Sequence, residues 1–247
     1  MADNHDLLIL PNQGDSSIVL SDCRSSLAAR GRKDAASLLV LKPNSDDLWA
    51  ALSEPEGIFG CGVVYYVGEK VPRDYTKAAF FFHKAADKGH VRAQSILGTL
   101  YYFGDGVRQD YTEAATWFRK AADQGDASAQ ERLAVAYYHG EGVPQDRALA
   151  ATWCRKAAAQ GRASAQFLLG SQYKNGEGVP QDYSEAAVWI RNAAEQGLAA
   201  AQRFLGGLYH FGEGVKQDSQ EAEHWFRKAA DQGDDGAKSI LRSQYPD

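Results

Sequence analysis

Residues 93–107 of this 247-residue chain read Ala93-Gln94-Ser95-Ile96-Leu97-Gly98-Thr99-Leu100-Tyr101-Tyr102-Phe103-Gly104-Asp105-Gly106-Val107. The pattern returns 36 residues later at Ala129, and again at Ala165 and Ala201. The recurring features are an alanine, a leucine followed by a small residue, a tyrosine, and the turn Gly-x-Gly-Val. Self-similarity at a fixed period of this size indicates a repeat protein.

The segment after each Gly-x-Gly-Val turn keeps the same period. Its recurring residues are Asp110, Ala114, Trp117, Ala121, Ala122 and Gly125, then Asp146, Ala150, Trp153, Ala157, Ala158 and Gly161, and so on to Gly233. A looser copy precedes them, in which Phe81 replaces the tryptophan and Lys70 replaces the second loop glycine. The register holds without insertion, so every copy should adopt the same local structure.

Each copy predicts two helices. Ala129, Leu133 and Tyr137 are spaced as one apolar helical face, and the segment around Trp117 has a second such face. The glycines end the helices because glycine adopts positive φ without a Cβ clash. The aspartate is an expected N-cap; the pairs Asp110/Glu113, Asp182/Glu185 and Asp218/Glu221 have the spacing of a capping box. The fold class predicted is all-α: an α/α solenoid of helix pairs forming a superhelix.

The expected organisation is five repeats and two ends. The repeats span 54–89, 90–125, 126–161, 162–197 and 198–233, and residues 234–247 form a C-terminal capping helix. Residues 1–53 break the pattern. We interpret them as a degenerate N-terminal helical cap, with a tail or a small extra element as the alternatives.

Composition excludes several classes of function. The net charge of −5 supplies no basic face for nucleic acid, so neither nucleic acid nor an anionic membrane is an expected partner. No apolar run is long enough to span a bilayer, and the acidic N-terminus does not resemble a secretory signal, so a cytoplasmic location is expected.

No pattern indicates catalysis, a cofactor or a metal site. Cys23, Cys61 and Cys154 are odd in number and do not recur with the repeat, and no histidine pair has metal-ligand spacing. Cys61 and Cys154 stand at core positions, which predicts packing. The Gly-x-Gly turns follow helices and occur four times, with a looser fifth copy at Gly68, whereas a phosphate-binding loop follows a strand and occurs once.

These residues resemble the Sel1-like repeat family, a relative of the tetratricopeptide repeat. Residues 90–233 match its pattern almost throughout, and 54–89 match it more loosely. The resemblance implies a scaffold or adaptor that binds proteins, often in bacteria. Some bacterial members look like immunity proteins, so an inhibitor of a toxin or enzyme is the alternative. The cysteine pairs of the family's secreted branch are missing here.

A stripe on the first helices varies between copies, opposite the Ala/Leu/Tyr row. It consists of Ser95, Thr99 and Tyr102, then Glu131, Val135 and Tyr138, then Phe167, Ser171 and Lys174, then Arg203, Gly207 and His210, and finally Ser239 and Ser243. First helices line the concave face in related solenoids, so this stripe is the predicted partner-binding groove. A merely solvated face is the alternative.

Three functional hypotheses follow. The first is a monomeric, non-catalytic adaptor that holds a protein or peptide in the groove, where aromatic residues would supply affinity. Arg203 and Lys174 would then favour an acidic partner. The second is a hydrolase-type enzyme, which requires a cluster of perturbed titratable residues that the sequence does not show. The third is a self-assembling protein whose solenoid ends stack.

Overall fold

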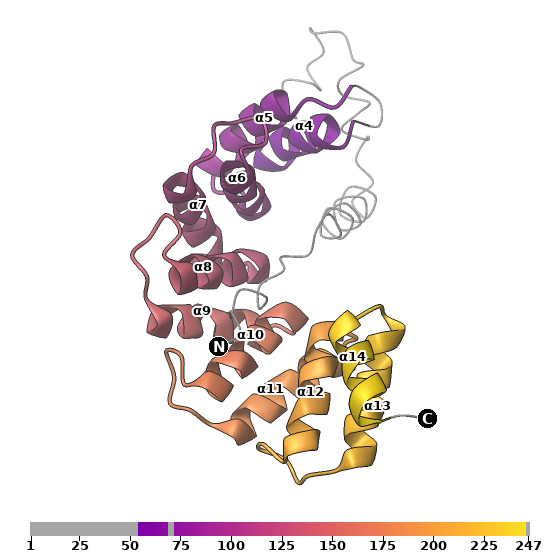
Figure 1. Ribbon diagram of the computed structural model, residues 1–247. Helices are drawn as coiled ribbons and strands as arrows, with labels where there is room; N and C mark the ends of the chain where they lie inside the picture. The colour runs from indigo at the N-terminus through magenta and orange to yellow at the C-terminus, as the bar shows by residue number, and fades with distance from the viewer. Residues whose placement is uncertain (1–53, 69–71, 246–247) are drawn as a thin grey trace, which may run out of the picture. The chain divides into compact units, whose positions relative to one another are not determined.

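The computed structural model describes residues 54–68 and 72–245, and the predicted N-terminal cap at 1–53 lies outside them. Every regular element in the described part is an α-helix, as predicted (Figure 1). The helices are α4 (Pro55–Val67), α5 (Tyr75–Asp87), α6 (Val91–Phe103), α7 (Tyr111–Asp123), α8 (Ala127–His139), α9 (Arg147–Ala159), α10 (Ala163–Asn175), α11 (Tyr183–Glu195), α12 (Ala199–Phe211), α13 (Ser219–Asp231) and α14 (Asp235–Gln244).

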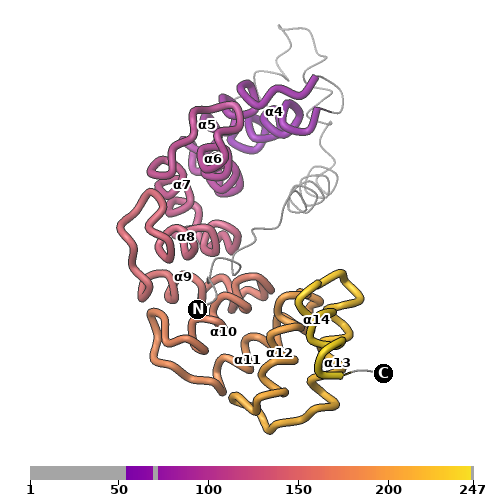
Figure 2. The backbone as a smooth tube through the Cα atoms, in the orientation of Figure 1, coloured from indigo at the N-terminus to yellow at the C-terminus, as the bar shows by residue number. Residues whose placement is uncertain are grey.

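The helices alternate between two kinds. The even-numbered helices are the first helices of the repeats and carry the Ala/Leu/Tyr row, whereas the odd-numbered ones are the second helices. The chain divides into two compact units, residues 1–109 and 110–247. Within the second unit each helix packs against the next in the chain, and the Gly-x-Gly loops follow one another along one side of the stack (Figure 2). The structure is an α/α solenoid.

The predicted helix ends are confirmed in atomic detail. The carboxylate of Asp146 accepts a hydrogen bond from the Leu149 N–H at 2.9 Å, and the aspartates of the other second helices cap in the same manner. Each first helix in the repeats ends at a glycine with positive φ, such as Gly140 at 77°. The glycine after each second helix is also left-handed, as at Gly161 with φ 87°.

The capping box is only half formed. The Asp182 carboxylate accepts from the Glu185 N–H at 3.0 Å, as predicted. The N–H of Asp182 donates instead to the carbonyl of Tyr173 at 2.9 Å, where a capping box would use the glutamate side chain. The same bond joins Asp218 to Tyr209. In these repeats the bond ties the start of the second helix to the first helix of the same repeat.

Small residues allow the two helices of a repeat to approach closely. A Cβ built on Gly170 would lie 2.6 Å from a side-chain carbon of Ile190. One repeat carries the larger Ala134 at this position, and there the facing residue is the smaller Cys154. Cys154 is fully buried, so its predicted packing role is confirmed. The side chains at the two positions together fill a constant volume, so a larger residue on one helix goes with a smaller residue on the other.

The second loop glycine contacts the preceding repeat. A Cβ on Gly142 would lie 1.9 Å from the carbonyl oxygen of Tyr111, at the start of α7, and Gly178 and Gly214 make the equivalent approach. No side chain fits at such a distance. The Gly-x-Gly turn is therefore a structural contact between repeats, which supports the prediction that it is not a phosphate-binding loop.

A matched pair of glycine variants tests this contact. Gly142 and Gly161 both have positive φ, so Gly142→Ala and Gly161→Ala each introduce backbone strain of about 1–2 kcal/mol. Only Gly142 meets the preceding repeat, since nothing lies within 4 Å of a Cβ on Gly161. We expect Gly142→Ala to lower the free energy of unfolding considerably more in urea titrations. Equal losses would contradict the contact.

The tryptophan of the second helix is a core residue. Trp153 is 7% exposed, and the Lys156 ammonium lies 3.9 Å from its ring centroid. We expect Trp153→Ala to lower the free energy of unfolding by about 3–5 kcal/mol, because it removes a large buried ring. Thr152→Ala, at the exposed neighbouring position, is the control and should change stability little. Urea denaturation followed by circular dichroism measures both.

Candidate functional site

The structure places the predicted binding residues on the first helices, at the positions that the periodicity indicated. Val135 and Ser171 are buried. The half-buried members are Ser95, Thr99, Tyr102, Glu131, Tyr138, Phe167, Lys174, Arg203 and His210. Ser239 and Ser243, on α14, are exposed. Partner binding by these residues stays a prediction, but many of them also make contacts between repeats.

Within the second unit, the first residue of the stripe in a repeat meets the residue that precedes the next first helix. Glu131 forms an ion pair with Arg162, and the Arg203 Nε lies 3.1 Å from the Asp234 carboxylate. Both pairs are separated by 31 residues in the chain. The order of the two charges is reversed between these pairs, but each pair joins an acidic and a basic side chain.

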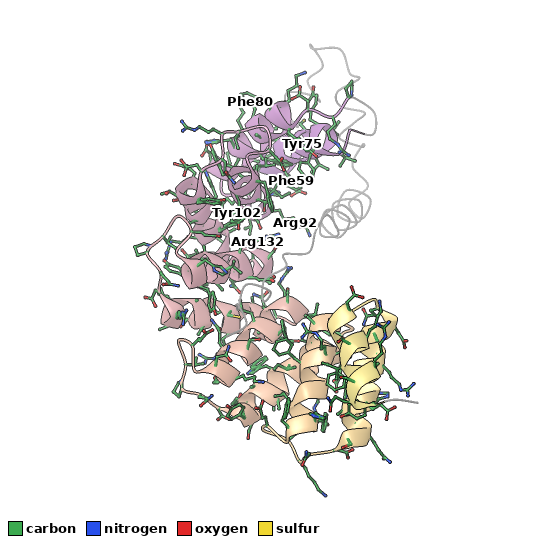
Figure 3. The ribbon with its side chains drawn as sticks, viewed as in Figure 1. Phe59, Tyr75, Phe80, Arg92, Tyr102 and Arg132 are labelled. Carbon is green, nitrogen blue, oxygen red and sulfur yellow. The ribbon has the colours of Figure 1, made fainter. Side chains whose placement is uncertain are left out.

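We call the contact between this position of a first helix and the residue before the next first helix a junction. Two further junctions use apolar and aromatic groups in place of charges, and one of them involves Phe59, which is equivalent to Ser95 in the preceding repeat. Phe167 and Leu198 pack against the same apolar cluster. In the first unit, the ring of Phe59 stacks on that of His90 with centroids 4.3 Å apart. Figure 3 shows Phe59 among the helices of this unit, whereas Phe80 points away from them. Aromatic stacking therefore joins successive first helices at the position where other repeats use an ion pair.

The residue immediately before a first helix occupies the N-cap position, so its identity also decides whether a side chain caps that helix. The side chains of Asp126 and Asp234 cap α8 and α14, but Arg162 and Leu198 make no side-chain cap. His90 caps α6 through Nδ1, which accepts from the Ala93 N–H at 3.1 Å. Burial lowers the pKa of His90, opposed by its hydrogen bond to Glu56, and a neutral ring is what accepting at Nδ1 requires.

In two repeats of the second unit, the last residue of the stripe reaches the Gly-x-Gly loop of the following repeat. The Tyr138 hydroxyl donates to the Glu177 carboxylate at 2.5 Å, and the Lys174 Nζ lies 2.9 Å from the Glu213 carboxylate. Glu177 and Glu213 occupy the middle position of Gly-Glu-Gly. In the repeat after these, the His210 Nδ1 lies 2.7 Å from the Tyr245 hydroxyl. Lys174 and Arg203 are therefore already paired within the chain.

A buried glutamine ladder runs parallel to these contacts, and the sequence analysis missed it. The Gln130 Nε2 donates to the Ala122 carbonyl at 3.1 Å, and the Gln130 Oε1 accepts from Gln160 at 2.8 Å. The repeats that follow contain the same bonds, through Gln196 with Gln166 and Gln232 with Gln202. Regular recurrence of these glutamines is the signal that could have revealed the ladder. Fully satisfied polar networks of this kind specify register.

Large apolar side chains remain exposed near the C-terminal ends of two first helices. Phe103 on α6 is 50% exposed and Phe211 on α12 is 69% exposed. Each forms an edge-on aromatic pair with the stripe residue before it, Tyr102 or His210. The sequence analysis did not include Phe103 and Phe211. Exposed aromatic groups are the strongest contributors to protein interfaces.

The described residues contain no group of three or more His, Cys, Asp or Glu side chains positioned to hold a metal ion. Burial raises the pKa of the Cys61 and Cys154 thiols, so neither has the lowered pKa typical of a catalytic cysteine.

Stacked helix pairs joined by recurring contacts define a helical-repeat solenoid. The Sel1 repeat matches residues 55–90, 91–126, 127–161, 163–198 and 199–234. The chain belongs to the Sel1 repeat family, as its resemblance suggested. Sel1 repeat proteins generally mediate protein–protein interaction.

Solved structures show the same fold. The Sel1 repeat protein from Oxalobacter formigenes is 33% identical with a TM-score of 0.75, over 92% of this chain and 90% of that one. The protein c5321, a protective antigen of uropathogenic Escherichia coli, is 31% identical with a TM-score of 0.77. The match covers 100% of this chain and 54% of c5321, so the chain spans about half the length of that protein.

More distant similarity does not decide the function. The immunity protein Pa5087 from Pseudomonas aeruginosa is 22% identical with a TM-score of 0.46, over 81% of this chain and 72% of that one. This likeness is too low to support the immunity alternative. No curated protein matches the chain significantly. No helix among the described residues is long and apolar enough to cross a membrane.

A charge exchange tests the junction pair on α8 and α10. Glu131→Arg and Arg162→Glu should each lower the free energy of unfolding by about 1 kcal/mol, since each places like charges together. The double variant restores opposite charges and should recover most of the loss, as coupled residues do. Urea titrations of the four proteins measure the coupling. Additive losses would show that the pair does not interact.

The titration of Tyr138 tests its contact with Glu177. Burial and the Glu177 carboxylate together raise the pKa of Tyr138 to about 12 from its usual value of 10.0. A raised pKa stabilises the fold below pH 10, and this contribution is lost as the pH rises from 10 to 12. Phenolate absorbance of the folded wild type should therefore contain a late component that Tyr138→Phe lacks. If the phenolate component that Tyr138→Phe lacks titrates near pH 10, like an ordinary tyrosine, the contact is contradicted.

Proposed function

We propose that this protein is a non-catalytic adaptor that binds a partner protein through the face formed by its first helices. The observation that carries the proposal is the exposure of Phe211, 69% of whose surface is accessible at the end of the predicted stripe. Phe103 repeats the feature on α6 in the first unit. A large exposed ring next to a second aromatic residue is typical of an interface anchor.

The pairing within the chain changes which partner chemistry is expected. The sequence alone favoured an acidic partner because of Lys174 and Arg203. The charges of both are offset within the chain by Glu213 and Asp234. An acidic partner would have to compete with these ion pairs. We therefore assign the affinity to the aromatic residues rather than to the basic ones.

The last helix argues against assembly through the C-terminal end. In α14, Lys238 stands where α12 has the buried Gln202, and Arg242 stands where α12 has Gly206. Arg242 is exposed and would obstruct the close approach that a small residue permits. A polar helix of this kind is an unfavourable surface for stacking a second copy. It favours a single copy that binds a different protein.

Affinity capture with a matched pair of variants tests the proposal. Phe211→Glu changes the first-helix face, and Val188→Glu changes another exposed apolar residue, 54% exposed, on the second helix α11. We expect the wild type to retain a stoichiometric protein, in cells or lysate of the source organism, that cross-links to α12. Phe211→Glu should lose it and Val188→Glu should keep it.

Other results would contradict specific parts of the proposal. Loss with Val188→Glu alone would place the partner on the second helices. Retention by both variants would exclude α12 as the contact. Circular dichroism of both variants is the control for folding, because both residues are exposed and neither substitution should unfold the protein.

A further inference from the structure

In three repeats the tryptophan of the second helix lies beneath a lysine of the same helix. The distances from the lysine Nζ to the ring centroid are 3.7 Å for Lys120 on Trp117, 3.9 Å for Lys156 on Trp153 and 4.5 Å for Lys228 on Trp225. Each lysine stands three residues after its tryptophan, so the helical spacing brings the ammonium over the ring. Each pair has the geometry of a cation–π interaction.

Trp189, the equivalent tryptophan of α11, has no such lysine. Asn192 stands three residues after it, and no cation lies over its ring within the part of the chain that the structure describes. The neighbouring Arg191 donates instead to the Tyr209 hydroxyl at 2.8 Å. Trp189 is half-buried, whereas the other three tryptophans are buried. Where the lysine is absent, part of the indole is therefore in contact with solvent.

Two carboxylates on α11 lie on the same side of the helix as this indole. Glu185 precedes Trp189 by four residues and Glu195 follows Asn192 by three, and both glutamates are exposed. Residues at these spacings are neighbours on a helix surface. Neither glutamate forms an ion pair with another described residue. The surface around the ring is therefore acidic and has no cation of its own.

Comparison with the other second helices shows what α11 lacks. Acidic residues stand at the same two positions in α7, as Glu113 and Asp123, and in α13, as Glu221 and Asp231. In both of those helices a lysine stands between the two acids, over the tryptophan. The helix α11 keeps the ring and both acids, but an uncharged side chain replaces the lysine.

We propose that Trp189, Glu185 and Glu195 bind a lysine side chain of a partner protein. The ammonium lies over the indole, as the lysines of this chain do at the three equivalent rings, and the two carboxylates balance its charge. The adjacent Val188, 54% exposed, offers apolar surface to the aliphatic part of the lysine. The occupant is basic because the site has the charge and the ring that hold a lysine elsewhere in the same chain.

This site goes beyond the proposed function, because it lies on a second helix and adds a basic residue to what the partner must supply. Phe211, which carries the adaptor proposal, is on the first helix α12 (Figure 1). Val188→Glu, the control of the capture experiment, adds a further carboxylate beside Trp189. It should therefore not weaken the binding of a cation.

The indole N–H signals of the isotope-labelled, full-length protein test the inference by nuclear magnetic resonance. The probe is a short peptide with blocked ends and a single lysine, and the matched peptide carries Nε-acetyl-lysine, which has no charge. Trp189→Phe identifies the Trp189 signal. We expect the lysine peptide to shift this signal saturably at millimolar concentration, as a single exposed cation–π contact allows. The acetylated peptide should leave the signal unchanged.

A variant that fills the site from within the chain is the sharpest test. Asn192→Lys places an ammonium on the Trp189 ring, as Lys156 does on Trp153. It should weaken the lysine peptide about tenfold or more without lowering the thermal midpoint, because it restores the arrangement of the other repeats. Ala159→Lys adds the same charge at an exposed position of α9 and is the control, which should bind nearly as the wild type does.

Other outcomes also decide the proposal. A Trp189 signal that does not move with the lysine peptide, or that moves equally with the acetylated one, would overturn the site. Equal affinity in the wild type and Asn192→Lys would do the same. Binding that is unchanged by Glu185→Gln combined with Glu195→Gln would remove the carboxylates from it. Capture with Phe211→Glu is a separate measurement, so the adaptor function and the lysine site can fail independently.

Discussion

The solenoid depends on the close approach of each Gly-x-Gly loop to the repeat before it. A Cβ on Gly178 would lie 2.0 Å from the carbonyl oxygen of Arg147, which leaves room for hydrogen alone. This contact fixes the distance between the loop of one repeat and the start of the preceding second helix. An insertion in either helix would move the glycine out of position. The uninterrupted 36-residue spacing of the sequence is the consequence.

With that spacing fixed, the remaining contacts between repeats can vary in chemistry. The glutamine ladder is the constant part, since Gln166 and Gln202 occupy equivalent positions and make equivalent bonds. The junction pairs are the variable part, with opposite orders of charge in Glu131–Arg162 and Arg203–Asp234. Variation between copies in a repeat protein is therefore not by itself evidence of partner binding. Part of the variation arises because a residue in one repeat is matched to its contact residue in the next repeat.

The sequence predicted what depends on neighbouring residues along the chain. The helices, their aspartate caps and their glycine ends follow from local geometry, and recurrence identified the core positions. The sequence analysis did not anticipate the contacts of Tyr138 with Glu177 or of Lys174 with Glu213. Which residues meet across repeats depends on how successive first helices lie against each other, and a helical pattern does not contain that information. The half-formed capping box has the same cause, since Tyr173 belongs to another helix.

Function in such a protein is best sought where a residue satisfies neither the local nor the inter-repeat requirements. Gly206 and Gly207 are neighbours in one helix, yet only Gly206 is required by packing. Ser171 and Gln172 are buried without hydrogen-bond partners in the part of the chain that the structure describes, although other repeats show that apolar residues fit these positions. Such residues lower the stability of the fold without improving its packing, and proteins retain residues of this kind chiefly at functional sites.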